Sequence, residues 1–192
     1  MKKIVVASIV GSIILFAWNA VSWMVMPTHL HSFRYTPAQD SILNVLKNSG
    51  LTTGAYMLPT IDNANVSSFD TAYHEKGKAM MDARIGKPMA TIFYVDAIPS
   101  MHPSQFLKGF LYTLIAVFCV CFLLSLAYQS DASFFMRWWM VMLIGIIIMM
   151  TGPMMNHNWM HEPWHYTKGL VYDALIGWAL TGLWLAKYLK KS

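Results

Sequence analysis

Four long apolar runs constrain this chain more than any other feature of its sequence. They cover residues 4–26, 109–129, 138–156 and 169–186. Each run is close to the roughly 20 residues that a helix needs to cross a bilayer. The composition is 56% hydrophobic and 12% charged, which is too apolar for an ordinary soluble domain. The sequence therefore predicts an integral membrane, mainly α-helical protein with four transmembrane helices and a small extracytoplasmic α/β domain inserted between helices 1 and 2.

The basic residues that flank these runs predict the orientation. Cations lie before the first run, between the second and third, and after the fourth, and all of them then fall on one side of the membrane: Lys2, Lys3, Arg137, Lys187, Lys190 and Lys191. Because cytoplasmic loops carry an excess of lysine and arginine, both termini are expected in the cytoplasm. The net charge of +5 then reflects the excess of cations on the cytoplasmic side. It therefore gives no support to nucleic-acid binding.

The first run, residues 4–26, has the basic start and apolar centre of a signal peptide. An uncleaved anchor is the preferred interpretation, because no small-x-small cleavage site follows and the run is longer than a usual signal core. Asn19 lies within this span, and its amide is expected either to sit at the polar interface or to bond to another helix. Pro27 is expected to end the helix.

Residues 27–106 are expected to form the extracytoplasmic domain. The order of patterns is a helix from residue 37 to 48, a strand over 52–58, a second helix ending near 85, and a strand over 89–95. Thr36 and Gln39 suggest a capping box for the first helix, and Ser67 or Ser68 a cap for the second. The strands could pair in parallel or antiparallel. Two strands make a marginal sheet, so docking onto the helices or a second copy is expected.

Residues 107–192 hold helices 2–4, a short cytoplasmic link at 129–137 and a His/Trp-rich outer loop at 156–168. The third and fourth runs contain small residues three or four apart, which allow helix backbones to approach closely: Gly145, Thr151, Gly152, Ala174, Gly177, Thr181 and Gly182. Cys119 and Cys121 point to different helix faces and are interpreted as packing residues.

Histidines gather beside the membrane, where three different crossings begin or end: His29, His31, His102, His157, His161 and His165. Imidazole is a good ligand for zinc, copper and haem iron, so these six are candidate metal ligands. Nearby thioethers would favour cuprous copper: Met24, Met26, Met101, Met154, Met155 and Met160. The alternative is that histidine and tryptophan simply occupy a polar interface.

Two of these histidines have helical spacing. His157 and His161 would share one face if the third helix continues that far, and Pro163 would turn the chain and deliver His165 separately. The His-Glu-x-x-His order of metalloproteases is absent, because Glu162 follows His161 but no second histidine comes at the required position.

Asp173 lies about one turn inside the fourth crossing. A carboxylate at that depth is costly unless it has a partner, and an ionisable residue there is by default a functional hypothesis. It is expected to accept a proton, orient a ligating histidine or bind a cation. The structural alternative is that it is shallow enough to meet water, Lys168 or a loop histidine.

No nucleophile motif, phosphate loop or nucleotide fingerprint is present, which favours a non-enzymatic role. The sequence predicts an accessory or scaffold subunit of a larger bacterial inner-membrane assembly, whose partners are the lipid bilayer and other membrane proteins or further copies of itself. Its domain 27–106 would lie in the periplasm. The alternative function is a metal- or haem-binding membrane protein for copper handling, electron transfer or oxidoreduction, with copper, zinc or haem held by the six histidines. A transporter is a weaker third idea.

Overall fold

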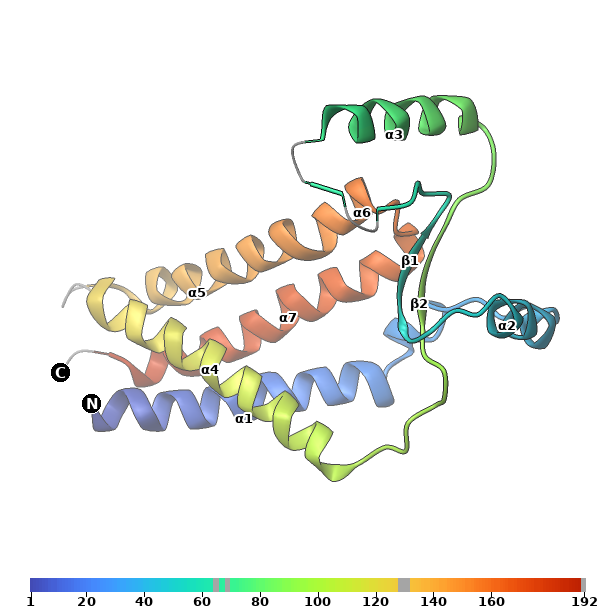
Figure 1. The fold of residues 1–192 in the computed structure, drawn as a ribbon. Helices are drawn as coiled ribbons and strands as arrows, with labels where there is room; N and C mark the ends of the chain where they lie inside the picture. The colour runs from blue at the N-terminus through green and yellow to red at the C-terminus, as the bar shows by residue number, and fades with distance from the viewer. Residues whose placement is uncertain (64–65, 68–69, 128–131, 191–192) are drawn as a thin grey trace. The chain divides into compact units, whose positions relative to one another are not determined.

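The computed structural model describes residues 1–63, 66–67, 70–127 and 132–190. Contacts within the chain divide it into two units (Figure 1). The helical unit comprises Met1–Tyr35 and Met101–Ser192, and the small unit comprises Thr36–Ser100. Each unit is described by itself.

The helical unit contains four helices that are long and apolar enough to cross a membrane, as the sequence predicts. They are α1 (Lys2–Met24), α4 (Pro103–Ala127), a third helix over Phe134–Trp159, and α7 (Trp164–Tyr188). α4, the third helix and α7 begin four to six residues before the apolar runs expected for them, since polar and aromatic flanks extend each helix. The four candidate spans confirm the prediction of a mainly helical chain compatible with a multi-pass membrane protein.

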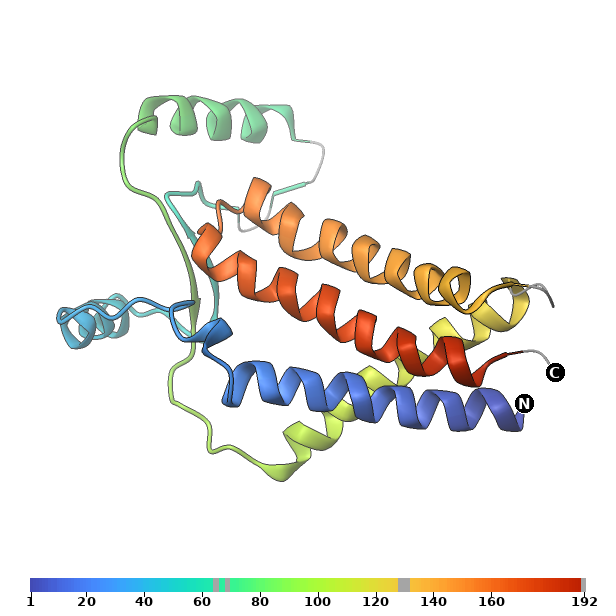
Figure 2. The ribbon, with the colours of Figure 1, turned by 180° about the vertical axis from the view of Figure 1, so that it is seen from behind.

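α7 is the central element of the helical unit, because it packs against both α1 and α5 (Figures 1 and 2). α4 lies against α1 on the other side and crosses it obliquely. The N-terminus of α1 and the C-terminus of α7 lie at the same end of the unit (Figure 1). We call the opposite end, where α1 ends and α7 begins, the distal end.

Small residues let these helices approach closely. A Cβ atom added to Gly177 would lie 2.7 Å from Leu15 of α1, and one added to Gly145 would lie 2.8 Å from Trp178. Gly182 faces Trp138 and Val141 in the same way. The expectation of close packing is therefore confirmed at these three glycines, whereas Gly152 has no atom within 4 Å of an added Cβ.

The third helix changes its winding near its distal end. It consists of α5 (Phe134–Met149), a π-helical turn (Met150–Met154) and α6 (Met155–Trp159). Pro153 lies inside the π-helical turn. Because proline has no N–H and crowds the carbonyl of the preceding turn, a wider turn allows the helix to continue past it.

Arg137 links the N-terminal end of α5 to the C-terminal end of α7. Its side chain is buried, and its Nε donates a hydrogen bond of 2.8 Å to the Ala186 carbonyl. A second guanidinium nitrogen donates to the Ala132 carbonyl. The sequence indicated Arg137 only as an orientation signal, but its guanidinium also satisfies carbonyls at a helix end. The expected link at 129–137 lies partly outside the described residues, and α5 already begins at Phe134.

The small unit follows the expected order of helix, strand, helix and strand. These elements are α2 (Gln39–Asn48), β1 (Gly54–Leu58), α3 (Thr71–Arg84) and β2 (Ala90–Tyr94). β1 pairs with β2 antiparallel, with Tyr56 opposite Ile92 at the centre of the register. The antiparallel alternative is therefore the correct one, and the parallel pair with a crossover helix is wrong. Gly50 and Gly86 follow the two helices at φ of 72° and 80°, where glycine avoids a steric penalty.

Both predicted helix caps in this unit differ from the structure. Thr36 accepts a hydrogen bond from the N–H of Ala38, and the chain makes a turn before α2 begins at Gln39. Asp70, rather than Ser67, caps α3 by accepting a hydrogen bond of 3.1 Å from the N–H of Tyr73. Ser68 lies outside the described residues. Serine, threonine and aspartate all cap helices well, so composition alone does not select among neighbouring candidates.

Candidate functional site

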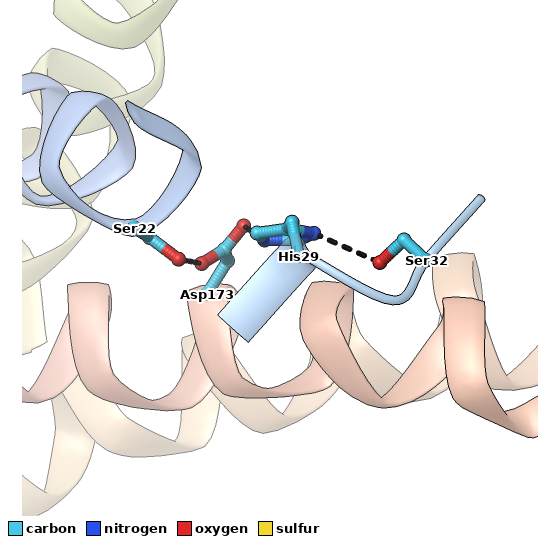
Figure 3. Close-up of polar contacts among 4 residues, drawn as sticks. All are labelled: Ser22, His29, Ser32 and Asp173. Atoms are coloured by element: carbon cyan, nitrogen blue, oxygen red, sulfur yellow. Dashed lines mark hydrogen bonds and ion pairs between the residues drawn. The ribbon is translucent and has the colours of Figure 1, made fainter. Parts of the chain in front are cut away.

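Asp173 is the centre of a polar cluster at the distal end of the helical unit. Its Oδ1 accepts a hydrogen bond of 2.5 Å from the hydroxyl of Ser22, and its Oδ2 lies 2.9 Å from Nε2 of His29 (Figure 3). Only 12% of the Asp173 side chain and 5% of the His29 side chain are exposed. The partner of Asp173 is therefore a loop histidine, as one of the alternatives for this residue anticipated, together with a serine of α1.

The local fold explains why His29 reaches this position. α1 ends at Met24, and Pro27 starts a short 3₁₀ helix (Pro27–His29) that turns the chain back toward α7. Ser22 lies in the last turn of α1, and Asp173 lies in the third turn of α7. Two helices and the segment after the first one thus place three polar side chains around one point (Figure 3).

The His29 ring is held on both sides. The Trp23 ring stacks on it with centroids 3.8 Å apart and an angle of 10° between the planes. On the α7 side, a Cβ atom added to Gly169 would lie 2.7 Å from Cε1 of His29. Glycine is therefore required at position 169 for the ring to lie against the helix. The packing leaves the imidazole little freedom to rotate away from Asp173.

The hydrogen-bond pattern assigns the proton on His29. A carboxylate only accepts, so Nε2 must donate to Asp173, and Nδ1 is the nitrogen left with a lone pair in the neutral ring. The hydroxyl of Ser32 lies 3.4 Å from Nδ1. Buried charges persist when they are paired and hydrogen-bonded, and Asp173 has both a hydroxyl and an imidazole as donors.

Ser32, His29 and Asp173 follow one another in space as in a nucleophilic triad. However, the hydroxyl of Ser32 is not placed to attack a substrate. Ser32 is 4% exposed, and its hydroxyl lies at the long limit of hydrogen bonding from Nδ1. Ser32 is not among the residues that line either of two cavities at this end of the unit, of about 490 and 700 Å³. The cluster is better described as a buried polar link between α1, the segment after it, and α7.

Two of the remaining histidines have structural partners near the distal end. His102 caps α4: its Nδ1 accepts from the N–H of Ser104, while Gln105 accepts from the N–H of His102. His157 lies 2.6 Å, through Nδ1, from the carbonyl oxygen of Glu162, and its ring contacts Trp164 edge-on.

The expected shared helix face of His157 and His161 is not formed. α6 ends at Trp159, and His161 lies in the following turn with a φ of 53°, in the left-handed region. His165 lies in the first turn of α7, as Pro163 precedes that helix. The helix stops before His161 because the chain must reverse direction to begin α7.

The six histidines do not converge in the described part of the chain. No group of three or more histidine, cysteine, aspartate or glutamate residues there could hold a metal ion. Met24 and Met26 line a cavity of about 490 Å³ together with His29, so two of the candidate thioethers share a cavity with a candidate histidine. Binding of copper, zinc or haem stays a prediction.

Asn19 is partly buried in α1, and no hydrogen bond of its side chain to another described residue is found.

Sequence reasoning missed the roles of Ser22, Trp23 and Ser32. One signal was present for Ser22: it lies two heptads after Ser8, and both face the interior.

Comparisons with protein-family models, with curated proteins and with solved structures found no match.

Proposed function

We propose that this chain is a non-enzymatic accessory or scaffold subunit of a larger bacterial inner-membrane assembly. In this proposal its four apolar helices cross the membrane with both termini in the cytoplasm, and the small unit contacts a partner in the periplasm. The positive charges at the ends of the apolar runs support this orientation.

The observation that carries the proposal is that the small unit buries almost nothing. Among its described residues only Tyr94 is buried, and neither α2 nor α3 contains a buried residue. Large apolar side chains remain open, including Phe93 at 82% and Ile98 at 97% exposure. Burial of apolar surface is the main term that stabilises a fold, so a unit of this kind gains stability from a surface outside itself.

The cluster around Asp173 supports a structural role over a chemical one. The hydrogen bonds of Asp173 link α1 and the segment that follows it to α7. That segment leads directly into the small unit, which begins at Thr36. A rigid exit from the membrane is what a scaffold needs in order to present a domain to a partner.

Site-specific photocrosslinking in native membranes tests this proposal. A photoreactive residue at Val45, an exposed apolar position of α2, should give one discrete product between this chain and a second protein. The matched control is Lys78, an exposed charged position of α3, which should give none. Absence of any product from Val45 and from a second apolar position, Phe93, would contradict the proposal.

One observation favours the metal- or haem-binding alternative. Ligating histidines commonly donate their second ring N–H to a carboxylate, and His29 donates Nε2–H to Asp173 in this way. Elemental analysis and an optical spectrum of protein purified without a histidine tag test it. Near-stoichiometric metal that is lost in His29→Ala would establish this alternative, and a metal-free, colourless wild type would remove it.

A further inference from the structure

A second cavity, of about 700 Å³, lies at the distal end of the helical unit. Its walls come from the segment that follows α1 and from the first turn of α7. They consist of Leu30, His31, Phe33, Arg34, Tyr35 and His165. All six residues belong to the helical unit, so the cavity does not depend on the position of the small unit.

The polar side of this cavity is cationic. Arg34 supplies a permanent charge, and His31 and His165 supply imidazoles, while no aspartate or glutamate lines the cavity. Among the described residues Arg34 forms no ion pair, and the Asp173 carboxylate is already bonded to Ser22 and His29. An unpaired guanidinium beside two imidazoles attracts an anion.

The start of α7 adds to this field. The N–H groups of Tyr166 and Thr167 both donate to the carbonyl of Pro163, and the N–H groups of Trp164 and His165 have no backbone acceptor among the described residues. The first N–H groups of a helix carry a partial positive charge and bind phosphate readily. Since His165 is both a wall of the cavity and part of this first turn, the positive end of α7 lies beside the cavity that Arg34 also lines.

The other side of the cavity is apolar. Leu30 and Phe33 line it and are largely exposed, and the Phe33 ring packs edge-on against Tyr166 with centroids 5.5 Å apart. A cationic wall beside an apolar wall suits an amphiphile that has an anionic head. The cavity lies next to the ends of two candidate membrane-spanning helices. In the proposed membrane orientation, this position corresponds to the depth of a lipid headgroup.

We propose that this cavity is a binding site for a phosphate ester, held by the Arg34 guanidinium and the imidazoles of His31 and His165 beside the N-terminal end of α7. Guanidinium groups match phosphate oxygens in pairs, so Arg34 is the residue that selects phosphate over a simple halide. The phosphate comes either from an anionic phospholipid or from a free phosphate ester, and the two sources share the same polar contacts. The lipid source rests on the proposed membrane crossing, whereas the phosphate site itself does not depend on the proposed scaffold role.

The test uses the full chain in detergent. Native mass spectrometry with phosphatidic acid and with phosphatidylcholine reports lipid binding, and calorimetry with glycerol 3-phosphate reports binding of a free ester. The informative variant is Arg34→Gln. The matched control is Lys168→Gln, which removes one cation from α7 at a position outside the cavity wall.

We expect Arg34→Gln to weaken binding about tenfold or more, because a hydrogen bond to a charged group is lost, while Lys168→Gln changes it little. Arg34→Lys keeps the charge without the paired donors, so its affinity should lie between those of Arg34→Gln and Lys168→Gln. If Arg34→Gln does not fold, the affinity of Arg34→Lys tests the proposal in its place. Binding of phosphatidic acid without glycerol 3-phosphate supports the site with a lipid source, and binding of both supports it with a free ester as well. Binding of neither ligand, or equal weakening by Arg34→Gln and Lys168→Gln, overturns the proposal.

Discussion

The helical unit and the small unit use their side chains differently. In the helical unit Val117, Val141 and Leu185 are fully buried, and so are polar side chains such as Ser22. In the small unit two helices and a two-stranded sheet form with almost no burial. Packing between elements therefore stabilises the first unit, whereas local signals such as caps and turns shape the second. Four predictions, from the largest expected effect to the smallest, test this difference.

Asp173→Ala should have the largest effect. The substitution leaves the buried donors of His29 and Ser22 without their acceptor, and each buried donor left unsatisfied costs roughly 1–3 kcal/mol. The measurement is the free energy of unfolding of the detergent-solubilised chain in SDS titration. A double-mutant cycle with His29→Ala checks the cause: additive losses would show that the two side chains do not act as a pair.

Gly145→Ala should lower the free energy of unfolding by about 1–3 kcal/mol. The new Cβ would lie 2.8 Å from the Trp178 Cβ, so the two helices must separate. Gly152→Ala is the matched control on the same long helix, where nothing lies within 4 Å. It should change the same unfolding free energy by less than about 0.5 kcal/mol. Equal losses at the two glycines would contradict close packing of α5 on α7.

Asp70→Ala should cost about 1 kcal/mol locally, because α3 loses the side chain that caps it. Hydrogen exchange of the α3 amides should quicken by about fivefold, while the amides of α7 keep their rates. Ser133→Ala removes the corresponding cap of α5, whose first turn is also held by the packing of Arg137, which is buried and bonded to the Ala186 carbonyl of α7. A quickening at α5 as large as that at α3 would show that packing adds nothing there.

Ile42→Ser should have the smallest effect on stability. Ile42 is exposed on α2, so its replacement should change the unfolding free energy of the purified chain by less than about 0.5 kcal/mol. Leu185→Ala, at a fully buried position of α7, should cost about 2–5 kcal/mol. If Ile42→Ser proved as costly as Leu185→Ala in thermal or SDS unfolding, α2 would have a packed side within the chain.

Local features of the sequence were enough to place most elements. Apolar runs of sufficient length located α1, α4, the third helix and α7, since hydropathy depends on composition over one segment. The two segments predicted as strands, the second of them rich in β-forming residues, located β1 and β2 to within two residues, and Gly50 and Gly86 marked the ends of α2 and α3. The caps were misplaced because several capping residues stand close together there.

Only the tertiary structure decided what the functional candidates contact. Asp173 stood out in the sequence as a carboxylate in an apolar run, but its partners Ser22 and His29 lie about 150 residues away in the chain. The same holds for the six histidines, which lie near the ends of helices yet do not converge in the described chain. Hydropathy identifies a segment as a candidate membrane helix, and the faces on which two helices meet determine which polar side chains contact each other.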